Sequence, residues 1–422
     1  MSNTHATGRL LLLVPTTSYR IGDFLSAAER LGVNVAVGSD QRQVLEQYSG
    51  GHTLTLDIKD VGRGVAQIAA YSADYPLAAI VGVDDETTLI AAKASQALGL
   101  PHNTPDSIEA TGNKYRFRTR LANSGLLAPR FTLLAVTDDP AKAARSSFYP
   151  AVLKPLALSA SRGVIRANDP AQFAIAFRRI SMILQQADMR READRHILVE
   201  EYIPGKEVAL EGLLDKGHLA VLVLFDKPDP LEGPYFEETI YVTPSRLGAH
   251  IQDAIAATVN HAVAALRLRE GPIHAEMRIN DRGVWLIEVA ARSIGGLCSR
   301  ALHFGASGRL EDLILRHALG LSIPTVEQGR PATGVMMIPI PAAGILRRVA
   351  GIEIARAVTD IEDVTISTPL GATLVPVPEG NRYLGFIFAS GDTPDAVEAA
   401  LRRAHGHLEF TIEPVGPAAI SI

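Results

Sequence analysis

Two glutamates on a central hairpin constrain the fold of this chain more than any other feature. The stretch GPIHAEMRINDRGVWLIEVAARSIGG predicts strands over residues 273–280 and 284–290, separated by a three-residue loop, 281–283. A loop of this length with glycine in the left-handed region is a common hairpin type. The register that follows places Glu276 directly opposite Glu288. The hairpin therefore brings two carboxylates together on one face of a sheet.

The same register sorts the hairpin into a polar face and an apolar face. The polar face holds His274, Glu276, Arg278 and Glu288. The apolar face holds Ile273, Ala275, Met277, Ile279, Trp285, Ile287 and Val289. A shift of one residue would mix the two sets, so the sequence disfavours it.

The opposed glutamates require a positive partner, because like charges whose Cβ atoms lie about 5 Å apart across a sheet destabilise it. Arg278 and Arg292 can supply part of that charge, which leaves an arginine-neutralised surface hairpin as one interpretation. A Mg²⁺ ion held by carboxylates and substrate phosphates is the other. Zinc is disfavoured, because His274 and Cys298 lack a recognised ligand spacing.

The segment after the hairpin carries an arginine and two adjacent glycines. Arg292 follows Glu288 by four residues and precedes Gly295 and Gly296. An arginine beside a metal-bound phosphate can stabilise a transferring phosphoryl group. The glycines would let backbone N–H groups reach a bound carboxylate or a tetrahedral oxyanion. Cys298 is expected to be a small core residue, since no base neighbours it in sequence.

Two lysines and a loop of small residues form a candidate phosphate site. Lys114 lies on a helix expected to begin near Ser107, and Lys154 ends an apolar strand. The loop SASRGV, residues 159–164, follows, and its small residues let backbone N–H groups approach an anion. Lys154 would place a point charge at the phosphates, with Lys114 on the other side. Two snorkelling surface lysines beside a turn are the alternative interpretation.

A strand edge followed by a turn forms a candidate purine site. Residues 196–199 are predicted as a strand, and Glu200, Glu201 and a Pro-Gly turn follow it. Backbone groups of Glu201 and Ile203 can contact the adenine ring, with Glu200 accepting from its amino group. On the next strand, Glu207 can bridge the ribose hydroxyls. An ordinary polar strand face is the alternative interpretation.

The length of 422 residues predicts two or three domains. Residues 1–104 alternate buried strands, such as the continuous apolar run 10–14, with helices, such as 21–31, as a small doubly wound unit does. They contain no G-x-G-x-x-G. Residues 105–322 carry the candidate site. Residues 323–422 form the last domain, which is expected to begin with a linker at Pro324 and the EQGRP stretch. Residues 330–422 are then expected to form a mostly β unit with one clear helix, 394–404.

The doubly wound unit has its own candidates for substrate contact. Ligands of such sheets bind beyond the carboxyl ends of the strands. Tyr19, Asp85 and Glu86 are expected at those ends. Solvated loop residues are the alternative interpretation for each.

Composition argues against several classes of partner. The net charge of -5 and the lack of a lysine-arginine block give no reason to expect nucleic acid or an anionic membrane surface. No stretch approaches the roughly 20 apolar residues of a membrane span. The single cysteine rules out a disulfide within the chain, which fits a cytoplasmic protein.

The order of these segments resembles that of the ATP-grasp superfamily. Lys114, Lys154 with its Ser-Ala-Ser loop, VEEYIPGKEV, HAEMR and IEVAARSIGG follow one another as in that superfamily. The chain looks most similar to carboxylate–amine ligases, including the L-amino acid ligases that make dipeptides. The implied fold is α/β and α+β, with an N-terminal Rossmann-like pre-ATP-grasp domain, a central ATP-grasp fold and a C-terminal mostly β domain. A lid would span about residues 130–200 and carry the small-residue loop.

The resemblance also implies roles for individual residues. Phosphate contacts fall to Lys114, Lys154, Ser159, Ser161 and Gly163. The adenine pocket falls to Glu200, Glu201 and Ile203, and the ribose to Glu207. Glu276 and Glu288 match magnesium ligands, and Arg292 matches the catalytic arginine that acts with Lys154. The implied cofactors are ATP and one or two Mg²⁺ ions, with Mn²⁺ as a substitute.

One position departs from the family pattern. Many members carry asparagine two residues after the second metal glutamate, where it binds a second magnesium, and this chain has Ala290. The number of metal ions is therefore open. For the substrates, Glu237 or Glu238 would hold an ammonium group and Arg278 a carboxylate, with Gly295 and Gly296 nearby. A mobile acidic surface loop is the alternative for the two glutamates.

These expectations combine into one leading function. The chain is expected to be an ATP-dependent ligase that joins a small-molecule carboxylate to an amine through an acyl phosphate, releasing ADP and phosphate, and to act as a homodimer. One alternative is a carboxylase that uses bicarbonate, like biotin carboxylase or the purine-pathway carboxylases. The other is an ATP-binding regulatory protein without turnover, for which Ala290 is the only support.

Overall fold

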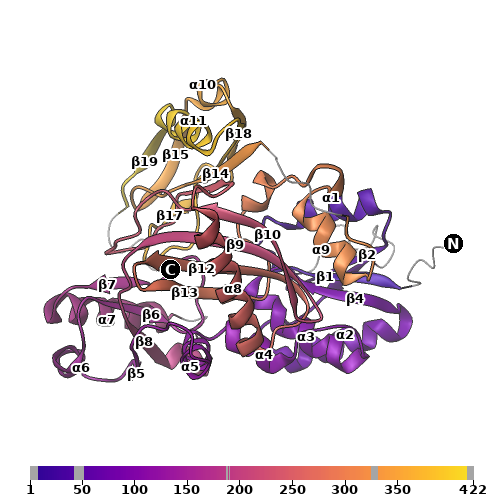
Figure 1. Ribbon diagram of the computed structural model, residues 1–422, viewed down its shortest axis with the longest axis horizontal. Coiled ribbons are helices and arrows are strands. Elements are labelled where there is room, and N and C mark those ends of the chain that lie inside the picture. Colours follow the sequence, from indigo (N-terminus) through magenta and orange to yellow (C-terminus); the bar gives the residue numbers. More distant parts are fainter. Residues whose placement is uncertain (1–7, 42–51, 187–188, 190, 325–330, 416–422) are drawn as a thin grey trace.

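The computed structural model describes residues 8–41, 52–186, 189, 191–324 and 331–415. The molecule contains an α/β unit at the N-terminus, a segment with its own sheet and a long central sheet (Figure 1). The segment with its own sheet coincides with the expected lid and is called the lid below. The linker expected after Pro324 lies outside the described residues.

The N-terminal unit is a parallel sheet of four strands in the order β3-β2-β1-β4. Its elements are β1 (Arg9–Leu13), α1 (Ile21–Leu31), β2 (Val35–Ser39), β3 (Thr53–Thr55), α2 (Val61–Asp74), β4 (Leu77–Gly82) and α3 (Asp85–Leu98). The side chains of residues 10–13 are fully buried, as their continuous apolar run predicted. Helix α1 begins and ends at the predicted residues, and Gly32 closes it in the left-handed conformation.

The single helix expected near Ser107 is wrong, because the chain forms two helices there. They are α4 (Pro105–Thr111) and α5 (Lys114–Asn123). The Asn113 side chain accepts hydrogen bonds from the backbone N–H groups of Tyr115 and Arg116, so it caps a new helix. Lys114 is consequently the first residue of α5 and does not lie in a helix interior.

The lid is an antiparallel sheet in the order β5-β8-β6-β7. Its elements are β5 (Phe131–Ala135), α6 (Pro140–Ser146), β6 (Ala151–Pro155), β7 (Ile165–Ala167), α7 (Pro170–Leu184), the 3₁₀ turn η2 (Glu192–Arg195) and β8 (His196–Glu201). The apolar face of α7 packs on this sheet through Phe173, Phe177 and Ile180. The lid therefore has a hydrophobic core of its own.

The central sheet has eight strands in the order β13-β12-β9-β10-β11-β14-β18-β16. The strands of its first part are β9 (Lys206–Asp215), β10 (His218–Asp226), β11 (Ile240–Thr243), β12 (Gly271–Asn280) and β13 (Gly283–Ala290). Helix α8 (Ala249–Leu266) buries Ile255, Val259 and Val263 against one face. Helix α9 (Leu310–Ala318), preceded by the 3₁₀ turns η3 (Cys298–Ala301) and η4 (Gly305–Ser307), packs with α1 in the core on the other side. No helix in the described parts of the chain is long and apolar enough to cross a membrane.

The C-terminal strands continue the central sheet. Strand β14 (Ala332–Ile338) pairs with β11, and β18 (Gly385–Gly391) and β16 (Ile361–Ile366) follow it outward. A second small sheet contains β15 (Gly344–Ala350), β17 (Thr373–Leu374) and β19 (Glu409–Glu413). Two helices accompany these strands, the short α10 (Ile352–Arg356) and α11 (Pro394–Gly406). Helix α11 agrees with the predicted one, whereas α10 was not predicted.

The central hairpin contains both the predicted glutamate pair and an error in register. Glu276 does pair with Glu288, but Asn280 pairs with Gly283, so the loop has two residues instead of three. A β-bulge between Glu276 and Met277 absorbs the difference.

The bulge also corrects the predicted faces of the hairpin. Leu286 lies in the core with Met277, whereas Trp285 donates from Nε1 to Asn280 Oδ1 and lies over Arg282. Ile287 belongs to none of the core clusters and is only partly buried. The assignment of Trp285 and Ile287 to the apolar face was therefore wrong.

The turn from β4 into α3 offers a test of close backbone packing. A Cβ atom on Gly82 would lie 2.9 Å from backbone atoms of Thr87 and Thr88, whereas one on Gly22 in α1 would meet nothing within 4 Å. Gly82→Ala should lower the free energy of unfolding by about 1–3 kcal/mol through overpacking. Gly22→Ala should leave it unchanged or raise it by up to about 1 kcal/mol. Urea unfolding of both variants measures this, and equal effects would contradict it.

Candidate active site

A lysine that sequence reasoning missed lies at the centre of the polar face. Lys227, which follows β10, places its Nζ atom 2.7 Å from Glu207, 2.5 Å from Glu238 and 3.1 Å from Glu276. Its side chain is 3% exposed, and it also lies over the Tyr241 ring. The three carboxylates lie close enough together to bind a metal ion. The signal that singled out Lys154, a lysine after an apolar strand, would also have found Lys227.

A buried histidine supports one of the candidate metal ligands. His274 Nδ1 lies 2.5 Å from Glu211, and Nε2 lies 3.2 Å from Glu276. Burial alone would lower the pKa of His274, but the two carboxylates outweigh it and raise the pKa to about 10. His274 is therefore an imidazolium that donates both hydrogen bonds. Tyr241 Oη also lies 3.2 Å from Glu276 Oε1.

The opposed glutamates are compensated by cations other than those expected. Lys227 and His274 contact Glu276, and Lys114 Nζ lies 3.7 Å from Glu288 Oε2. In the described part of the chain neither Arg278 nor Arg292 forms a salt bridge with these two acids. The interpretation of an arginine-neutralised hairpin therefore does not describe this face.

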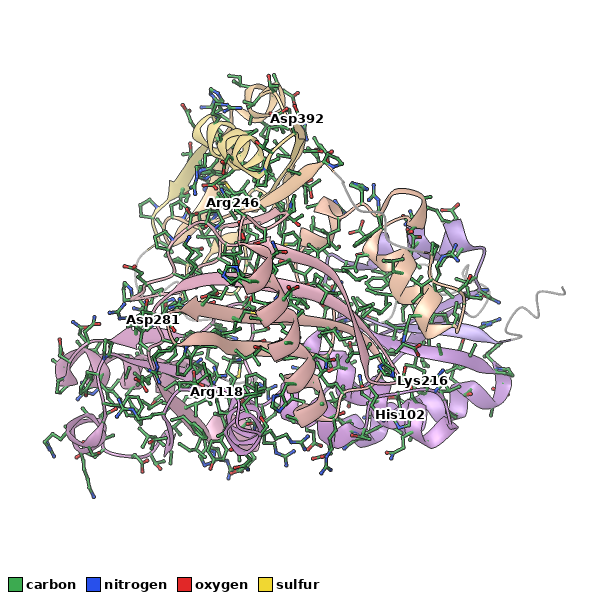
Figure 2. All side chains as sticks on the ribbon, in the orientation of Figure 1. His102, Arg118, Lys216, Arg246, Asp281 and Asp392 are labelled. Atoms are coloured by element: carbon green, nitrogen blue, oxygen red, sulfur yellow. The ribbon has the colours of Figure 1, made fainter. Side chains whose placement is uncertain are left out.

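Glu200 is buried in an ion cluster between the lid and the central sheet. Its carboxylate lies 2.5 Å from Lys154 Nζ and 2.5 Å from Arg118 Nε, and all three side chains are less than a tenth exposed. Arg118 also donates to the carbonyl oxygens of Leu286 and Ile287, so it connects the lid to β13. Figure 2 labels Arg118 among the side chains of the molecule. Burial would raise the pKa of Glu200, but Arg118 and Lys154 outweigh it and lower the pKa to about 2.

The loop after Lys154 has the conformation of a turn that is tied to Lys114. Lys114 Nζ donates to the Leu158 carbonyl oxygen at 2.7 Å. Ser161 has a φ of +56° and Gly163 a φ of +74°, so the loop includes left-handed residues next to Ser159. Among the other purine candidates, Ile203 is buried, and Glu201 pairs with Arg130 at 3.1 Å near the surface.

Arg292 is held by the N-terminal unit. Its guanidinium donates to both carboxylate oxygens of Asp85 at 2.9 and 2.7 Å, so one expected contact of the doubly wound unit reaches the site. Burial alone would lower the pKa of Arg292, but the Asp85 carboxylate and, more weakly, the Glu288 carboxylate outweigh it and raise the pKa above its usual range. Gly296, with a φ of +60°, would bring a Cβ atom within 3.0 Å of the Phe386 ring.

Of the residues expected to contact a substrate, Arg278 is held by other groups of the protein, whereas Glu237 and Glu238 are carboxyl groups with raised pKa values. Arg278 donates to Glu207 Oε2 and to the Ile203 carbonyl oxygen, each at 2.8 Å, and is buried. Burial and Glu276 raise the pKa of Glu238 to about 7 despite Lys227. Glu237 is half-buried, and burial raises its pKa.

The donor set fits a hard divalent cation such as Mg²⁺. The paired glutamates of β12 and β13 offer carboxylate oxygens, which Mg²⁺ prefers. Glu207 and Glu238 add oxygens within 4.8 Å of a Glu276 oxygen. Ala290 is buried and offers no side-chain ligand.

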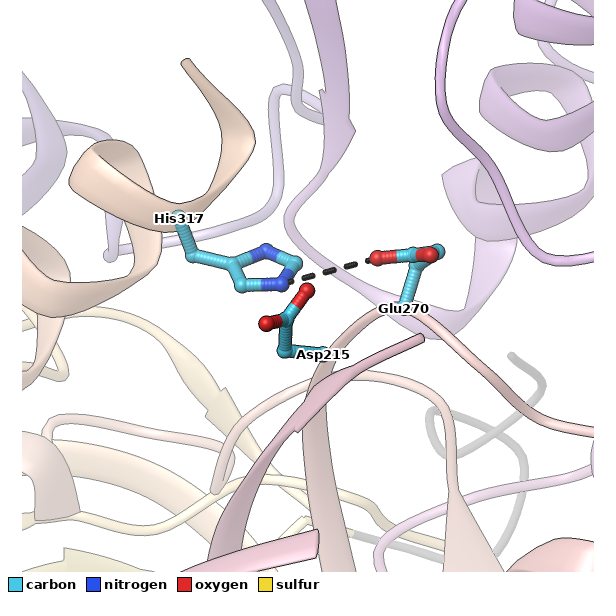
Figure 3. A group of neighbouring side chains, drawn as sticks. All are labelled: Asp215, Glu270 and His317. Carbon is cyan, nitrogen blue, oxygen red and sulfur yellow. Dashed lines mark ion pairs between the residues drawn. The ribbon is translucent and has the colours of Figure 1, made fainter. Parts of the chain in front are cut away.

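A second group of potential ligands lies at the other end of β9. His317 on α9 places Nε2 3.6 Å from Glu270, and Asp215 lies beside them (Figure 3). Asp215 is exposed and the other two are partly buried. This group connects α9 to the sheet and does not contribute to the site around Lys227.

Comparison with known proteins identifies the architecture. Residues 25–102 match an ATP-grasp N-terminal domain, residues 147–301 an ATP-grasp domain, and residues 336–413 the L-amino acid ligase C-terminal domain 2. The chain is an ATP-grasp ligase. Its fold matches that of an L-amino acid ligase from Bacillus licheniformis with a TM-score of 0.83 and 25% identity, over 96% of this chain and 99% of that one.

Sequence relatives of the ligase agree with this assignment. The chain is 24% identical to the uncharacterized protein y4rH of Sinorhizobium fredii, over 96% of this chain and 84% of that one. It is 27% identical to dapdiamide A synthase of Enterobacter agglomerans, over 53% of this chain and 52% of the enzyme. It is 25% identical to alanine–anticapsin ligase of Bacillus subtilis, over 48% and 46% of the two chains. The matches to these two enzymes thus span about half of their length.

Lys227 should be essential for stability because it compensates three buried carboxylates. Lys227→Met should lower the free energy of unfolding by about 3–5 kcal/mol, since breaking a buried ion cluster leaves uncompensated charge. Lys206→Met, which removes an exposed lysine of β9, is the matched control and should change it little. Chemical unfolding followed by circular dichroism measures both. A Lys227 variant as stable as the control would contradict the cluster.

The Glu200 cluster predicts a specific pH dependence. The pKa of Glu200 is about 2 in the folded protein, whereas the ordinary value for a glutamate is 4.5. The ionised carboxylate therefore stabilises the folded protein fully above pH 4.5, and this contribution is lost as the pH falls toward 2. The difference in unfolding free energy between wild type and Glu200→Gln should therefore shrink as the pH falls below about 5. Glu201→Gln, which breaks a more exposed ion pair, is the control and should lower the unfolding free energy by no more than about 1 kcal/mol. Urea unfolding across that range measures both, and a constant difference for Glu200→Gln would refute the assignment.

Proposed function

We propose that the ligase forms an amide or peptide bond between a small-molecule carboxylate and an amine by way of an acyl phosphate. The observation that carries the proposal is the pairing of the carboxylates Glu276 and Glu288, with the cations Lys114 and Arg292 both near Glu288. The domain order of the L-amino acid ligases supports the same conclusion. Magnesium as the metal, a homodimer and a cytoplasmic setting belong to this proposal.

The first step transfers the γ-phosphoryl group of ATP. A carboxylate oxygen of the substrate attacks the γ-phosphorus, the bond from that phosphorus to the β–γ bridging oxygen breaks, and ADP leaves. Glu276 and Glu288 would hold Mg²⁺, which offsets phosphate charge when bound. Arg292 and Lys154 stabilise the charge that spreads over the phosphoryl oxygens.

The second step forms the carbon–nitrogen bond. The amine nitrogen attacks the carbonyl carbon of the acyl phosphate, and the tetrahedral oxyanion collapses with loss of phosphate and of a proton from nitrogen. In this proposal, backbone N–H groups near Gly295 and Gly296 would stabilise the oxyanion. The lid must exclude water, because water would otherwise hydrolyse the acyl phosphate.

The acids around the site indicate where an amine could bind. Asp85 lies against Arg292, and Glu238 lies against Lys227, so each carboxylate could accept an ammonium group once its present partner turns to a substrate anion. An amino acid carries both charges, which makes amino acids the first substrates to test.

ADP release with MgATP and a panel of amino acids, singly and in pairs, tests the proposal. Hydroxylamine should trap the acyl phosphate as a hydroxamate, and Glu288→Gln should lower its formation at least about 100-fold because a metal ligand is lost. Glu409→Gln, at an exposed position of β19, is the control and should retain full activity.

Two other outcomes would contradict the ligase. ADP release stimulated by bicarbonate alone would support a carboxylase, a class that shares the fold: an N5-carboxyaminoimidazole ribonucleotide synthetase from Thermotoga maritima matches with a TM-score of 0.70 at 14% identity. ATP binding without ADP release in any arm would support a regulatory protein.

A further inference from the structure

The small-residue loop of the lid is held from outside the lid. The Gly163 N–H donates to the Pro378 carbonyl oxygen at 2.8 Å, and Arg162 Nε donates to the Glu379 carbonyl oxygen at 3.0 Å. Both acceptors lie in a turn between β17 and β18, residues 376–380, which the Gly380 N–H closes by donating to Pro376. The C-terminal part of the chain therefore contacts the expected phosphate loop directly.

The same turn also contacts the helix of the lid. The Glu379 carboxylate accepts from two nitrogens of Arg179 on α7, one of them at 2.8 Å. Arg179 donates in addition to the Tyr235 hydroxyl group. One glutamate thus joins the loop, through its carbonyl oxygen, and the helix, through its side chain. Such a two-point contact fixes both position and orientation of the loop.

The loop needs an external support because its backbone is strained. Ala160 and Ser161 have φ angles of +52° and +56°, which residues other than glycine rarely adopt. Conformations of this kind persist only where the surrounding structure enforces them, and they are typical of functional sites. Lys114 holds the loop at Leu158, and the turn 376–380 holds it at its other end.

We propose that the turn 376–380 is a latch that positions the phosphate-binding loop, with Glu379 as the positioning residue acting through Arg179 and Arg162. The proposal rests on the proposed function only where it assigns the loop to the nucleotide. Further attachments of the lid do not involve this turn; in one of them the Arg166 N–H donates to the Pro234 carbonyl oxygen at 2.8 Å. Loss of the latch should therefore loosen the loop without releasing the whole lid.

Hydrogen exchange of the full chain tests the latch without any substrate. In Glu379→Ala, the backbone amides of residues 159–164 should exchange roughly 3–10 times faster, as expected when a partly exposed ion pair supporting a local structure is lost. Glu192→Ala is the matched control, because Glu192 pairs at 3.4 Å with Arg195 within the lid and, among the residues that the structure describes, forms no ion pair outside it. Unchanged exchange in Glu379→Ala would overturn the proposal.

Charge reversal separates a positioning role from general damage. Arg179→Glu and Glu379→Arg should each speed exchange in the loop, and the double variant should restore protection at least in part, because the ion pair is re-formed in the opposite sense. Thermal melting shows whether any single variant is unfolded. If Glu379→Ala is unfolded, Glu379→Gln takes its place in the exchange experiment. Faster exchange in both single variants without recovery in the double one would refute the ion pair as the cause.

A second readout connects the latch to the nucleotide. Dissociation of MgADP should be faster in Glu379→Ala than in wild type by a similar factor, whether or not a substrate has been found. If loop exchange responds and MgADP dissociation does not, the loop does not contact the nucleotide and that part of the proposal is wrong. A failure of the ligase assay leaves both readouts intact, so the two proposals can fail separately.

Discussion

The arrangement of the site depends on how the protein compensates carboxylates that it removes from water. Burying an ionised carboxylate costs several kcal/mol unless a partner and hydrogen bonds compensate it. Lys227 meets this requirement for three glutamates at once, and His274 shares Glu276 with it. Because these partners come from β9, β10, β12 and the segment before β11, the cluster fixes how the strands present their polar side chains. The position of the candidate metal ligands follows from this compensation.

The glutamate pair was predictable, although the loop length behind the prediction was not. Alternation of polar and apolar residues placed Glu276 and Glu288 on one face, and the structure pairs them. The two-residue loop and the bulge compensate each other, and only the positions between them, such as Trp285, were misplaced. A bulge exchanges one local hydrogen-bonding pattern for another at small cost. Local sequence carries little signal for such an exchange.

Contacts between distant segments explain most of what the sequence did not reveal. Lys227 and Glu276 are far apart in the chain. They come together because β10 and β12 both pair with β9, which brings the two strands into one part of the sheet. Arg118 became important for the same reason, since α5 inserts it between the lid and β13. By contrast, α1 was predicted correctly from its own helical pattern of residues. Local patterns determine such elements, whereas strand order determines the partners of a buried charge.

The shared sheet has a consequence for how such enzymes can be divided or recombined. Strand β14 hydrogen-bonds along β11. The first part of the central sheet therefore ends on β11, which is an inner strand of the sheet and not an edge strand. Removing the C-terminal strands would leave the backbone N–H and C=O groups of β11 unpaired and open to pairing with other chains, which is a common route to aggregation. A replacement C-terminal domain would have to supply an antiparallel strand in the register of Ile240 with Met336. The C-terminal domain is therefore exchangeable only for modules that share this strand edge.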